Sequence, residues 1–548
     1  MDVMKGSVMR TRSVWSAASA PLPPHPAQHR FRAPQRLREA LRSDPRRLRL
    51  TVCVLGGALL FLELFYVLIL PQTPARAAKR SAELTGDLSL WSWLTSLPLP
   101  VPRSPGLIAA SLIVAALVAF SAYGLIVWLT WGKAGKGLGL IVAAFVAASF
   151  VISALALPNL NSDVYDYILF GRVVAEHDSN PAYTFPDEFP DDPVYPYSSH
   201  QYTDARDNKL PAWTVLSVGL AHLGGDDPVN NLLLFRFALL TLNLGAVGLI
   251  WLVLRRLQPA VAVAGIALYG LNPIVTMQGQ SKTDTVMAFF LLASIALLVT
   301  KHRRSAVVAL AVSMFVKLIT MPLAAVFWVR ELRLRRWSNL VVDVVAVGVV
   351  VFALYAPFSR GFELLFDNLG MLGSGGGSAP DIVRPIVFLA FALFILAVGL
   401  RQEGSTEQLL RGWALVSLVF GVLLSRPGLS WYLIVALAVV AVAAEWRMAV
   451  ASVVLTFSSF LVSSWTMMSS ARYPLPDIFE VPRPLLFVAP LGVLAALAIL
   501  WRAWHHRLHR NGHGIGSDGS VGTGGAGGSG EGDSDRRLAG SFTARGSE

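Results

Sequence analysis

The sequence predicts an all-α protein that crosses a membrane many times. Hydrophobic residues make up 54% of its 548 residues, charged residues only 15%, and the mean hydropathy is +0.56. The apolar residues come in runs of roughly twenty, the length at which a helix spans the hydrocarbon core of a bilayer. Soluble domains usually carry about a quarter charged residues, so an ordinary soluble enzyme is excluded.

The chain begins with a basic arm. Residues 1–49 contain eleven Lys and Arg but three Asp and Glu, and they are rich in Pro, Ser and Ala, a composition typical of disorder. We assign residues 1–47 to a disordered cytoplasmic arm, because positive charge beside a membrane span usually stays inside. An arm that binds nucleic acid is the alternative reading. A cleavable signal peptide is not expected, because the arm is long and the first apolar run is of spanning length.

The membrane domain is predicted to cover residues 48–504, and the Gly/Ser-rich end, 505–548, to be a disordered cytoplasmic tail. Polar breaks divide the apolar runs into expected spans at 48–70, 106–131, 137–160, 229–254, 260–277, 285–300, 339–357, 381–400, 411–424, 429–444, 448–468 and 485–503. The positive-inside rule assigns the basic clusters to the cytoplasm. These clusters are Arg255-Arg256, Lys301 to Arg304, Arg330 to Arg336, Arg447 and His505 to Arg510.

Residues 305–329 test this threading. A single crossing would carry the cluster Arg330 to Arg336 to the outside, against the rule. Two short helices that enter and return, with Lys317 at the apex, keep the cluster inside. Helices of about twelve residues cannot cross alone, so protein or a cavity must cover them. The expected bundle has about 12–14 transmembrane helices and both termini in the cytoplasm.

The same threading predicts an extracytoplasmic loop at 161–228. Within residues 161–210 lie ten Asp and Glu, three Lys and Arg, and six of the twelve tyrosines of the chain. Carboxylates accept hydrogen bonds from hydroxyl groups, and aromatic faces cover the apolar side of a sugar ring. The loop composition therefore favours sugar recognition. Its pairs Asp187-Glu188 and Asp191-Asp192 are expected to be solvated loop charges.

Asp163 and Asp166 follow the third predicted span and would share one face of a helix. A partly desolvated carboxylate at a membrane surface can act as a general base. A helix N-cap, formed by Ser162 or Asp163, is the structural alternative. A divalent metal held by the pair is a third.

Four further ionisable residues stand in short predicted turns: Lys282, Asp284, Lys317 and Arg426. Charged groups at membrane depth are costly and usually functional. Cations that converge from separate turns suit a lipid phosphate. Snorkelling of long basic side chains to the interface is the alternative.

Several signatures are absent from the sequence. The single cysteine, Cys53, allows no intrachain disulfide. There is no phosphate-binding GxxxxGK[ST] loop, no HExxH and no CxxC. Without a long cytoplasmic nucleotide-binding segment, any sugar donor must be carried by the membrane.

Five segments, in order, resemble actinobacterial polyprenol-phosphate-mannose-dependent α-mannosyltransferases, a group within the GT-C class of integral-membrane glycosyltransferases. They are SDVYDYILFGRVVAEHDSNPAY (162–183), LPAWTVLS (210–217), LNPIVTMQGQSKTDTVMAFFLL (271–292), MFVKLITMPL (314–323) and RPGLSWYLIVAL (426–437). Lys282 and Thr283 stand where that group has His-Asn, and Leu318 stands where it has Pro.

The resemblance implies a GT-C-like bundle that transfers a mannosyl or other hexosyl unit, with inversion, from a polyprenyl-phosphate sugar to a glycan or glycolipid of the cell envelope. It implies a catalytic Asp163 or Asp166, and donor phosphate binding by Lys317, Arg426 and Lys282. The substrate-binding residues expected from these motifs are Asp284, Tyr165, Arg172, Trp213 and Tyr432. The site would face away from the cytoplasm across the plasma membrane.

Two other classes remain open from the sequence. A secondary transporter also combines many spans with buried ions, usually in an internal inverted repeat, of which no trace is visible here. A non-catalytic scaffold or flippase partner of envelope assembly would tolerate the loss of both Asp163 and Asp166.

Overall fold

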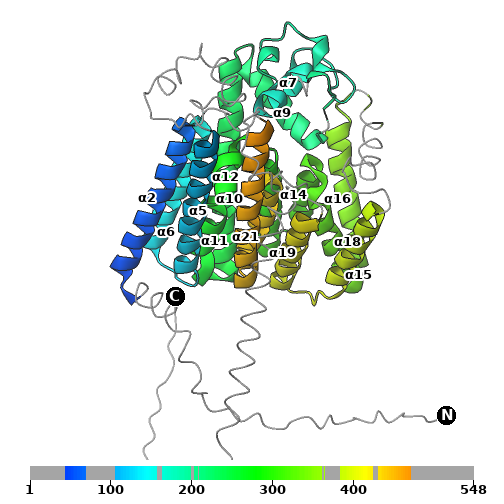
Figure 1. The fold of residues 1–548 in the computed structure, drawn as a ribbon. Coiled ribbons are helices and arrows are strands. Elements are labelled where there is room, and N and C mark those ends of the chain that lie inside the picture. Colours follow the sequence, from blue (N-terminus) through cyan, green and yellow to red (C-terminus); the bar gives the residue numbers. More distant parts are fainter. Residues whose placement is uncertain are drawn as a thin grey trace, which may run out of the picture. The chain divides into compact units, whose positions relative to one another are not determined.

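The computed structural model describes residues 43–69, 105–156, 163–198, 203–358 (except 208), 360, 363, 383–423 and 430–470. All of them belong to one compact unit that covers residues 32–495. Most of the basic arm, the tail, the last predicted span at 485–503 and Arg426 lie outside the described residues. Within the described part of the chain every regular element is a helix (Figure 1).

Three helices form the N-terminal group: α2 (Pro45–Ile69), α5 (Pro105–Thr130) and α6 (Lys136–Leu155). Asp44 accepts a hydrogen bond from the backbone N–H of Arg46 at 2.8 Å, and Pro45 follows it as the first helical residue. Arg49 lies beside Gly137 at the starts of α2 and α6, and Glu63 contacts Ser153 near their ends. The two helices therefore run parallel.

The polar segment after α6 is folded onto the bundle. Its helices are α7 (Asp163–Ala175), the short turns η3 (Pro186–Glu188) and η4 (Tyr195–Tyr197), and α9 (Pro211–Gly224). Gly171 allows α7 and α9 to approach closely, because a Cβ at this position would lie 2.7 Å from the backbone oxygen of Ser217. The hydroxyl of Ser217 donates to the carbonyl oxygen of Tyr167 at 2.6 Å. These contacts join the two helices through backbone groups.

The central part of the bundle contains a bent span. Helix α10 (Pro228–Leu257) leads through η5 (Pro259–Val261) to α11 (Ala262–Gly270), α12 (Pro273–Gln278), η6 (Gly279–Ser281) and α13 (Asp284–Val299). The segments Pro259–Gly270 and Pro273–Ser281 meet at an angle of 46°. Asn272 caps α12 by accepting from the backbone N–H of Ile274 at 2.9 Å, and Pro273 begins the new helix. The Asn-Pro sequence therefore accounts for the bend, because it ends one helix and begins the next.

The predicted broken pair at 305–329 is confirmed. Helix α14 (Arg303–Val316) ends at Lys317, and the chain returns through η7 (Leu318–Thr320) and α15 (Met321–Arg333). Arg303 at the start of α14 pairs with Glu331 near the end of α15 at 3.3 Å. The two helices thus enter and return, with Lys317 at the apex.

The remaining described helices complete the bundle: α16 (Trp337–Tyr355), α18 (Val383–Leu400), α19 (Thr406–Leu423), η8 (Ser430–Tyr432), α20 (Leu433–Ala443) and α21 (Trp446–Ser470). Every residue of α20 is buried. A helix that is apolar on all sides belongs in the interior, and α20 packs against α10, α11, α13, α19 and α21.

Six described helices are long and apolar enough to cross a membrane, or seven if the bent pair is one span. They are α2, α5, α6, α10, α16 and α21. Several other apolar helices, such as Asp284–Val299 and Ser430–Ala443, are shorter than this length. The described part of the chain is thus all helical and belongs to a multi-pass membrane protein with six or seven full-length spans, and the total of about 12–14 transmembrane helices stays a prediction.

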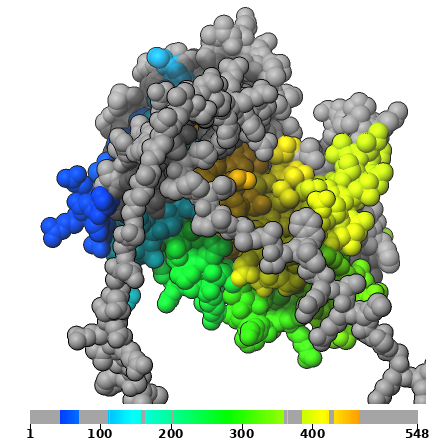
Figure 2. All heavy atoms as spheres, turned by 90° about the horizontal axis from the view of Figure 1, so that it is seen from below, coloured from blue at the N-terminus to red at the C-terminus, as the bar shows by residue number. Residues whose placement is uncertain are grey.

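Basic side chains gather at one end of the bundle. Arg303 pairs with Asp343 at 2.6 Å, Arg336 pairs with Glu331, and Arg333 donates to the carbonyl oxygen of Gln402. These contacts bring the starts of α14 and α16 to the ends of α15 and α18. Figure 1 shows α7 and α9 at the opposite end. Figure 2 shows the molecule from below, with α2 (blue) on one side of the green middle segment and α18 and α19 (yellow) on the other.

Candidate functional site

Two lysines stand at the breaks between short helices. Lys282 has an extended backbone between η6 and α13, and Lys317 has an extended backbone between α14 and η7. The chain reverses direction at both places, so both side chains reach the same end of the bundle as α7.

Each lysine is paired with an aspartate. The Nζ atom of Lys282 lies 2.5 Å from Oδ2 of Asp163, and Nζ of Lys317 lies 3.2 Å from both carboxylate oxygens of Asp284. In the first pair the lysine is 1% exposed and the aspartate 22%, whereas in the second the aspartate is 1% exposed and the lysine 22%. Each pair therefore has one fully buried member and one that reaches the surface. Together they contain two positive and two negative charges.

Two consecutive aromatic residues of η8 lie against the lysines. Nζ of Lys282 lies 3.6 Å from the ring centroid of Trp431, and Nζ of Lys317 lies 3.8 Å from that of Tyr432. The two rings are 6.3 Å apart and nearly perpendicular. A cation over an aromatic face is attracted by the ring quadrupole. Because Trp431 and Tyr432 are consecutive residues, the two ion pairs lie next to each other. The structure thus brings together five of the predicted site residues from four separate segments: Asp163, Lys282, Asp284, Lys317 and Tyr432.

Asp163 and Asp166 share the first turn of α7 but have different surroundings. Asp166 is 2% exposed and accepts a hydrogen bond from Ser198 at 2.8 Å. Asp163 contacts Lys282 and lies 3.5 Å from the hydroxyl of Tyr167. Asp163 is thus the member of the pair that joins the lysine cluster, while Asp166 fastens η4 to α7.

Arg172 lies in a second, structural ion-pair cluster. Its guanidinium group binds Asp192 at 2.9 Å and Asp226 at 2.9 Å, and Asp192 also contacts His177 at 3.1 Å. Burial by itself would lower the pKa of Arg172, but the hydrogen bond to Asp226 and the charge of Asp192 outweigh it and raise that pKa above its usual value. Arg172 was expected to bind substrate; its carboxylate partners instead tie α7 to the segment before α10.

The expectation that Asp191-Asp192 is a solvated pair is wrong for Asp192. Asp192 is buried, while Asp191, Asp187 and Glu188 are exposed as expected. The physical reason is the guanidinium group of Arg172, which compensates the charge of Asp192. The sequence could not predict this pairing, because Arg172 and Asp192 are twenty residues apart and the chain between them is mostly irregular.

Two predicted aromatic residues lie within the packed part of the polar segment. Trp213 is 1% exposed and packs edge-on against Tyr167 and Phe235. Tyr165 is also buried, and its ring stacks on Tyr197 at 5.6 Å. Trp213 therefore belongs to the core between α7, α9 and α10, and its predicted contact with substrate has no exposed surface to support it.

Sequence reasoning missed Trp431 and Arg236. Arg236 is buried in the middle of an apolar helix and donates to the backbone oxygens of Ser153 and Ala154 and to the hydroxyl of Ser281 at 3.0 Å. It therefore fixes the end of α6 beside the residue that precedes Lys282. The signal was available, because a lone arginine within an apolar run is usually retained for a specific partner.

The described residues contain no group of three or more His, Cys, Asp or Glu side chains arranged to hold a metal ion. Asp163 and Asp166 turn to different partners, so the two do not form the first part of a metal site. The chemistry available at the cluster is that of two ammonium groups, two carboxylates and two aromatic faces.

A scan against protein-family models matched no family, and searches of curated proteins and of solved structures found no match.

Proposed function

We propose that this protein is an integral-membrane glycosyltransferase that moves a mannosyl or other hexosyl unit from a polyprenyl-phosphate sugar to a glycan or glycolipid of the cell envelope. The observation that carries the proposal is the neighbouring pair of lysine–aspartate contacts under Trp431 and Tyr432. They lie where a bundle of apolar helices meets a folded polar segment, so a lipid-borne donor and the sugar part of a glycan or glycolipid acceptor can both reach them.

The lysines suit the donor phosphate. Two ammonium groups favour a phosphate at low dielectric, and each can exchange its aspartate for a phosphate oxygen without leaving its aromatic ring. Lys317 reaches the surface and would be the first of the two lysines to contact the donor phosphate, because Lys282 is fully buried. Arg426 remains a predicted third cation, which lies outside the described residues.

Asp163 is the proposed general base. When the donor phosphate takes Lys282, the Asp163 carboxylate loses its cation and is free to accept a proton. It accepts the proton of an acceptor hydroxyl, whose oxygen forms a bond to the anomeric carbon while the bond from that carbon to the phosphate oxygen breaks. The phosphate leaves as an anion, so cations suffice and no general acid is needed. Attack opposite the leaving group inverts the anomeric configuration, through an oxocarbenium-like transition state of the kind known for glycosides.

The proposed orientation follows from charge. The end with Arg303, Arg330, Arg333 and Arg336 would face the cytoplasm, together with both termini, and the α7 end would face outward across the plasma membrane. In this arrangement the shorter helices count as further transmembrane segments of a GT-C-like bundle with about 12–14 of them, covered by their neighbours in the bundle.

The experiment is transfer of radiolabelled mannose from polyprenyl-phosphate mannose to an envelope-lipid extract by the purified protein in liposomes. Asp163→Asn should lower turnover, measured per folded protein recovered by size-exclusion chromatography, by about 10²–10⁴ while donor binding persists. Asp187→Asn, an exposed acid of the same segment, is the matched control and should transfer normally. Near-normal turnover of Asp163→Asn would rule out the assigned base.

A secondary transporter is the second candidate, because the bend at Asn272-Pro273 and the break at Lys317 give two interrupted helices beside buried ion pairs. The same liposomes distinguish the two classes. Accumulation of labelled sugar inside sealed vesicles, with no labelled product formed, would favour transport.

A further inference from the structure

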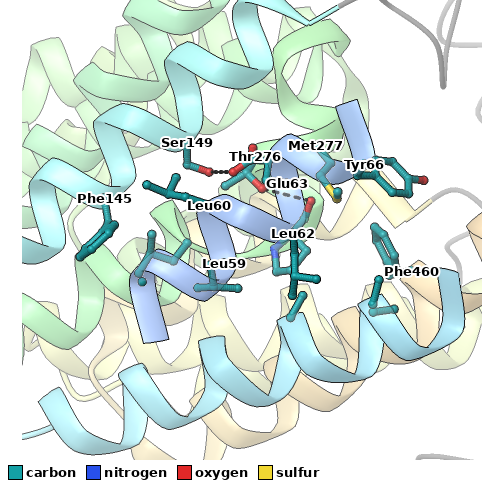
Figure 3. A pocket seen from close by; sticks show the side chains of 16 residues that line it. Leu59, Leu60, Leu62, Glu63, Tyr66, Phe145, Ser149, Thr276, Met277 and Phe460 are labelled. Carbon is teal, nitrogen blue, oxygen red and sulfur yellow. Dashed lines mark hydrogen bonds between the residues drawn. The ribbon is translucent and has the colours of Figure 1, made fainter. Parts of the chain in front are cut away.

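A pocket with a buried acid lies among the N-terminal helices. Its walls come from α2, α5, α6 and α12, with Leu271 and Phe460 completing it; it is partly open to the outside, and its interior cavity measures about 40 Å³. The lining is almost entirely aliphatic and aromatic, apart from the side chains of Glu63, Ser149, Thr276 and Tyr66 (Figure 3). A cavity of this size has room for one small polar group, such as a hydroxyl group or an ester oxygen.

Glu63 supplies the carboxyl group of this pocket. It lies on the membrane-spanning helix α2, is 6% exposed, and accepts hydrogen bonds from Ser149 and, at 2.5 Å, from Ser153. Figure 3 shows Glu63 and Ser149 facing each other beside the apolar lining. Among the described residues no basic side chain pairs with Glu63. A carboxyl group within a membrane span is costly and is usually retained for a function.

We infer that this pocket binds an uncharged lipid through a hydroxyl or ester group placed at Glu63. A carboxylate accepts from a lipid hydroxyl, and a protonated carboxyl donates to an ester oxygen, so either form of Glu63 has a partner in such a lipid. A lipid phosphate is disfavoured at this position, because the carboxylate repels it and because no cation among the described residues lies beside the carboxylate to offset that repulsion. The apolar residues around the opening then contact the adjoining part of the lipid chain.

The pocket is separate from the lysine cluster, but α12 joins the two. Thr276 and Met277 of α12 line the pocket, while Gln278 accepts from Ser430 of η8 at 2.6 Å. The inference itself depends only on the pocket and stands whether or not the protein transfers sugar.

The test uses the full-length protein in lipid nanodiscs with two photoreactive probes that carry the same diazirine acyl chain, a diacylglycerol and a phosphatidylglycerol. Cross-linked peptides are identified by mass spectrometry. The diacylglycerol should label α2, α5 or α12 at this pocket about tenfold more than the phosphatidylglycerol, as expected for one hydrogen bond gained in place of a repulsion.

Three variants make the outcome decisive. Ala119→Phe fills the pocket but leaves Glu63 and its serines in place, and Glu63→Leu removes the carboxyl group; both should abolish the preference for diacylglycerol. Glu63→Gln keeps a hydrogen-bonding group of the same size and should retain most of the labelling. Equal labelling by the two probes overturns the inference, and so does full labelling of Ala119→Phe. If Glu63→Leu lowers thermal stability without changing the labelling, Glu63 only clamps α2 to α6 and the inference fails.

Discussion

Lys282 contacts Asp163 at 2.5 Å across 119 residues of sequence, and this contact joins the polar helix α7 to the break before α13. The lysine is buried and the aspartate is partly exposed. Removal of Asp163 should therefore cost more stability than removal of Lys282, because it leaves the buried ammonium group of Lys282 without a partner and without contact with water.

The first prediction concerns the stability of this pair. Asp163→Asn leaves a buried ammonium group without its carboxylate and should destabilise the protein by about 3–5 kcal/mol, the usual cost of breaking a buried pair. The double variant Asp163→Asn with Lys282→Met should recover most of that loss, because neither charge remains. Thermal unfolding in detergent, followed by size-exclusion chromatography, measures both. Additive losses in the double variant would contradict the pairing.

The second prediction concerns the donor lipid. Lys317→Met should weaken binding of a polyprenyl-phosphate sugar by roughly tenfold or more, since a charge-assisted hydrogen bond contributes about 1.5–3 kcal/mol. Lys136→Met makes the same change at an exposed position at the start of α6, at the other end of the bundle. Equilibrium binding to a fluorescent donor analogue should separate the two variants. Equal affinities would show that the Lys317 ammonium group does not contact the phosphate.

The third prediction compares two adjacent aspartates. Asp192→Asn removes the charge that holds Arg172, whereas Asp191→Asn alters an exposed carboxylate next to it. Asp192→Asn should loosen the segment between α7 and α9, because Arg172 then keeps only the exposed Asp226 as a charged partner. Limited proteolysis of the protein in liposomes should cleave this segment about 5- to 150-fold faster in Asp192→Asn, because a loss of about 1–3 kcal/mol raises the population of the open segment by that factor. Asp191→Asn should be cleaved at the wild-type rate; if both variants behave alike, the Arg172 cluster does not hold the segment.

The fourth prediction compares two glycines on the facing helices of this segment. Gly171→Ala places a Cβ 2.7 Å from the backbone oxygen of Ser217, and should cost about 1–3 kcal/mol as α7 and α9 move apart. Gly219→Ala meets nothing within 4 Å and should be neutral or slightly stabilising. The midpoint of thermal unfolding distinguishes them. A wild-type midpoint for Gly171→Ala would show that the helices are not in close contact.

Much of the topology was predictable because hydrophobic run length and basic clusters are local properties of the chain. The return at Lys317 is the clearest case, since the cluster Arg330 to Arg336 required it and the pairing of Arg303 with Glu331 bears it out. Six or seven of the described helices are long enough to cross a membrane, whereas other apolar runs form helices of 10–17 residues. Run length by itself cannot distinguish a crossing from a short helix covered by its neighbours.

The sequence by itself determined an all-helical membrane protein, the polar segment after α6, and the charged residues at the turns. Only the tertiary structure decided which charge meets which: Asp163 with Lys282, Asp284 with Lys317, and Asp192 with Arg172. It also showed that Trp213 belongs to the core and that Glu63 and Arg236 are buried polar residues with specific partners. The reason is physical: the gain from burying apolar surface is a property of each residue and follows the local sequence, whereas the energy of a buried charge depends on its partner, and these partners lie twenty to more than one hundred residues away.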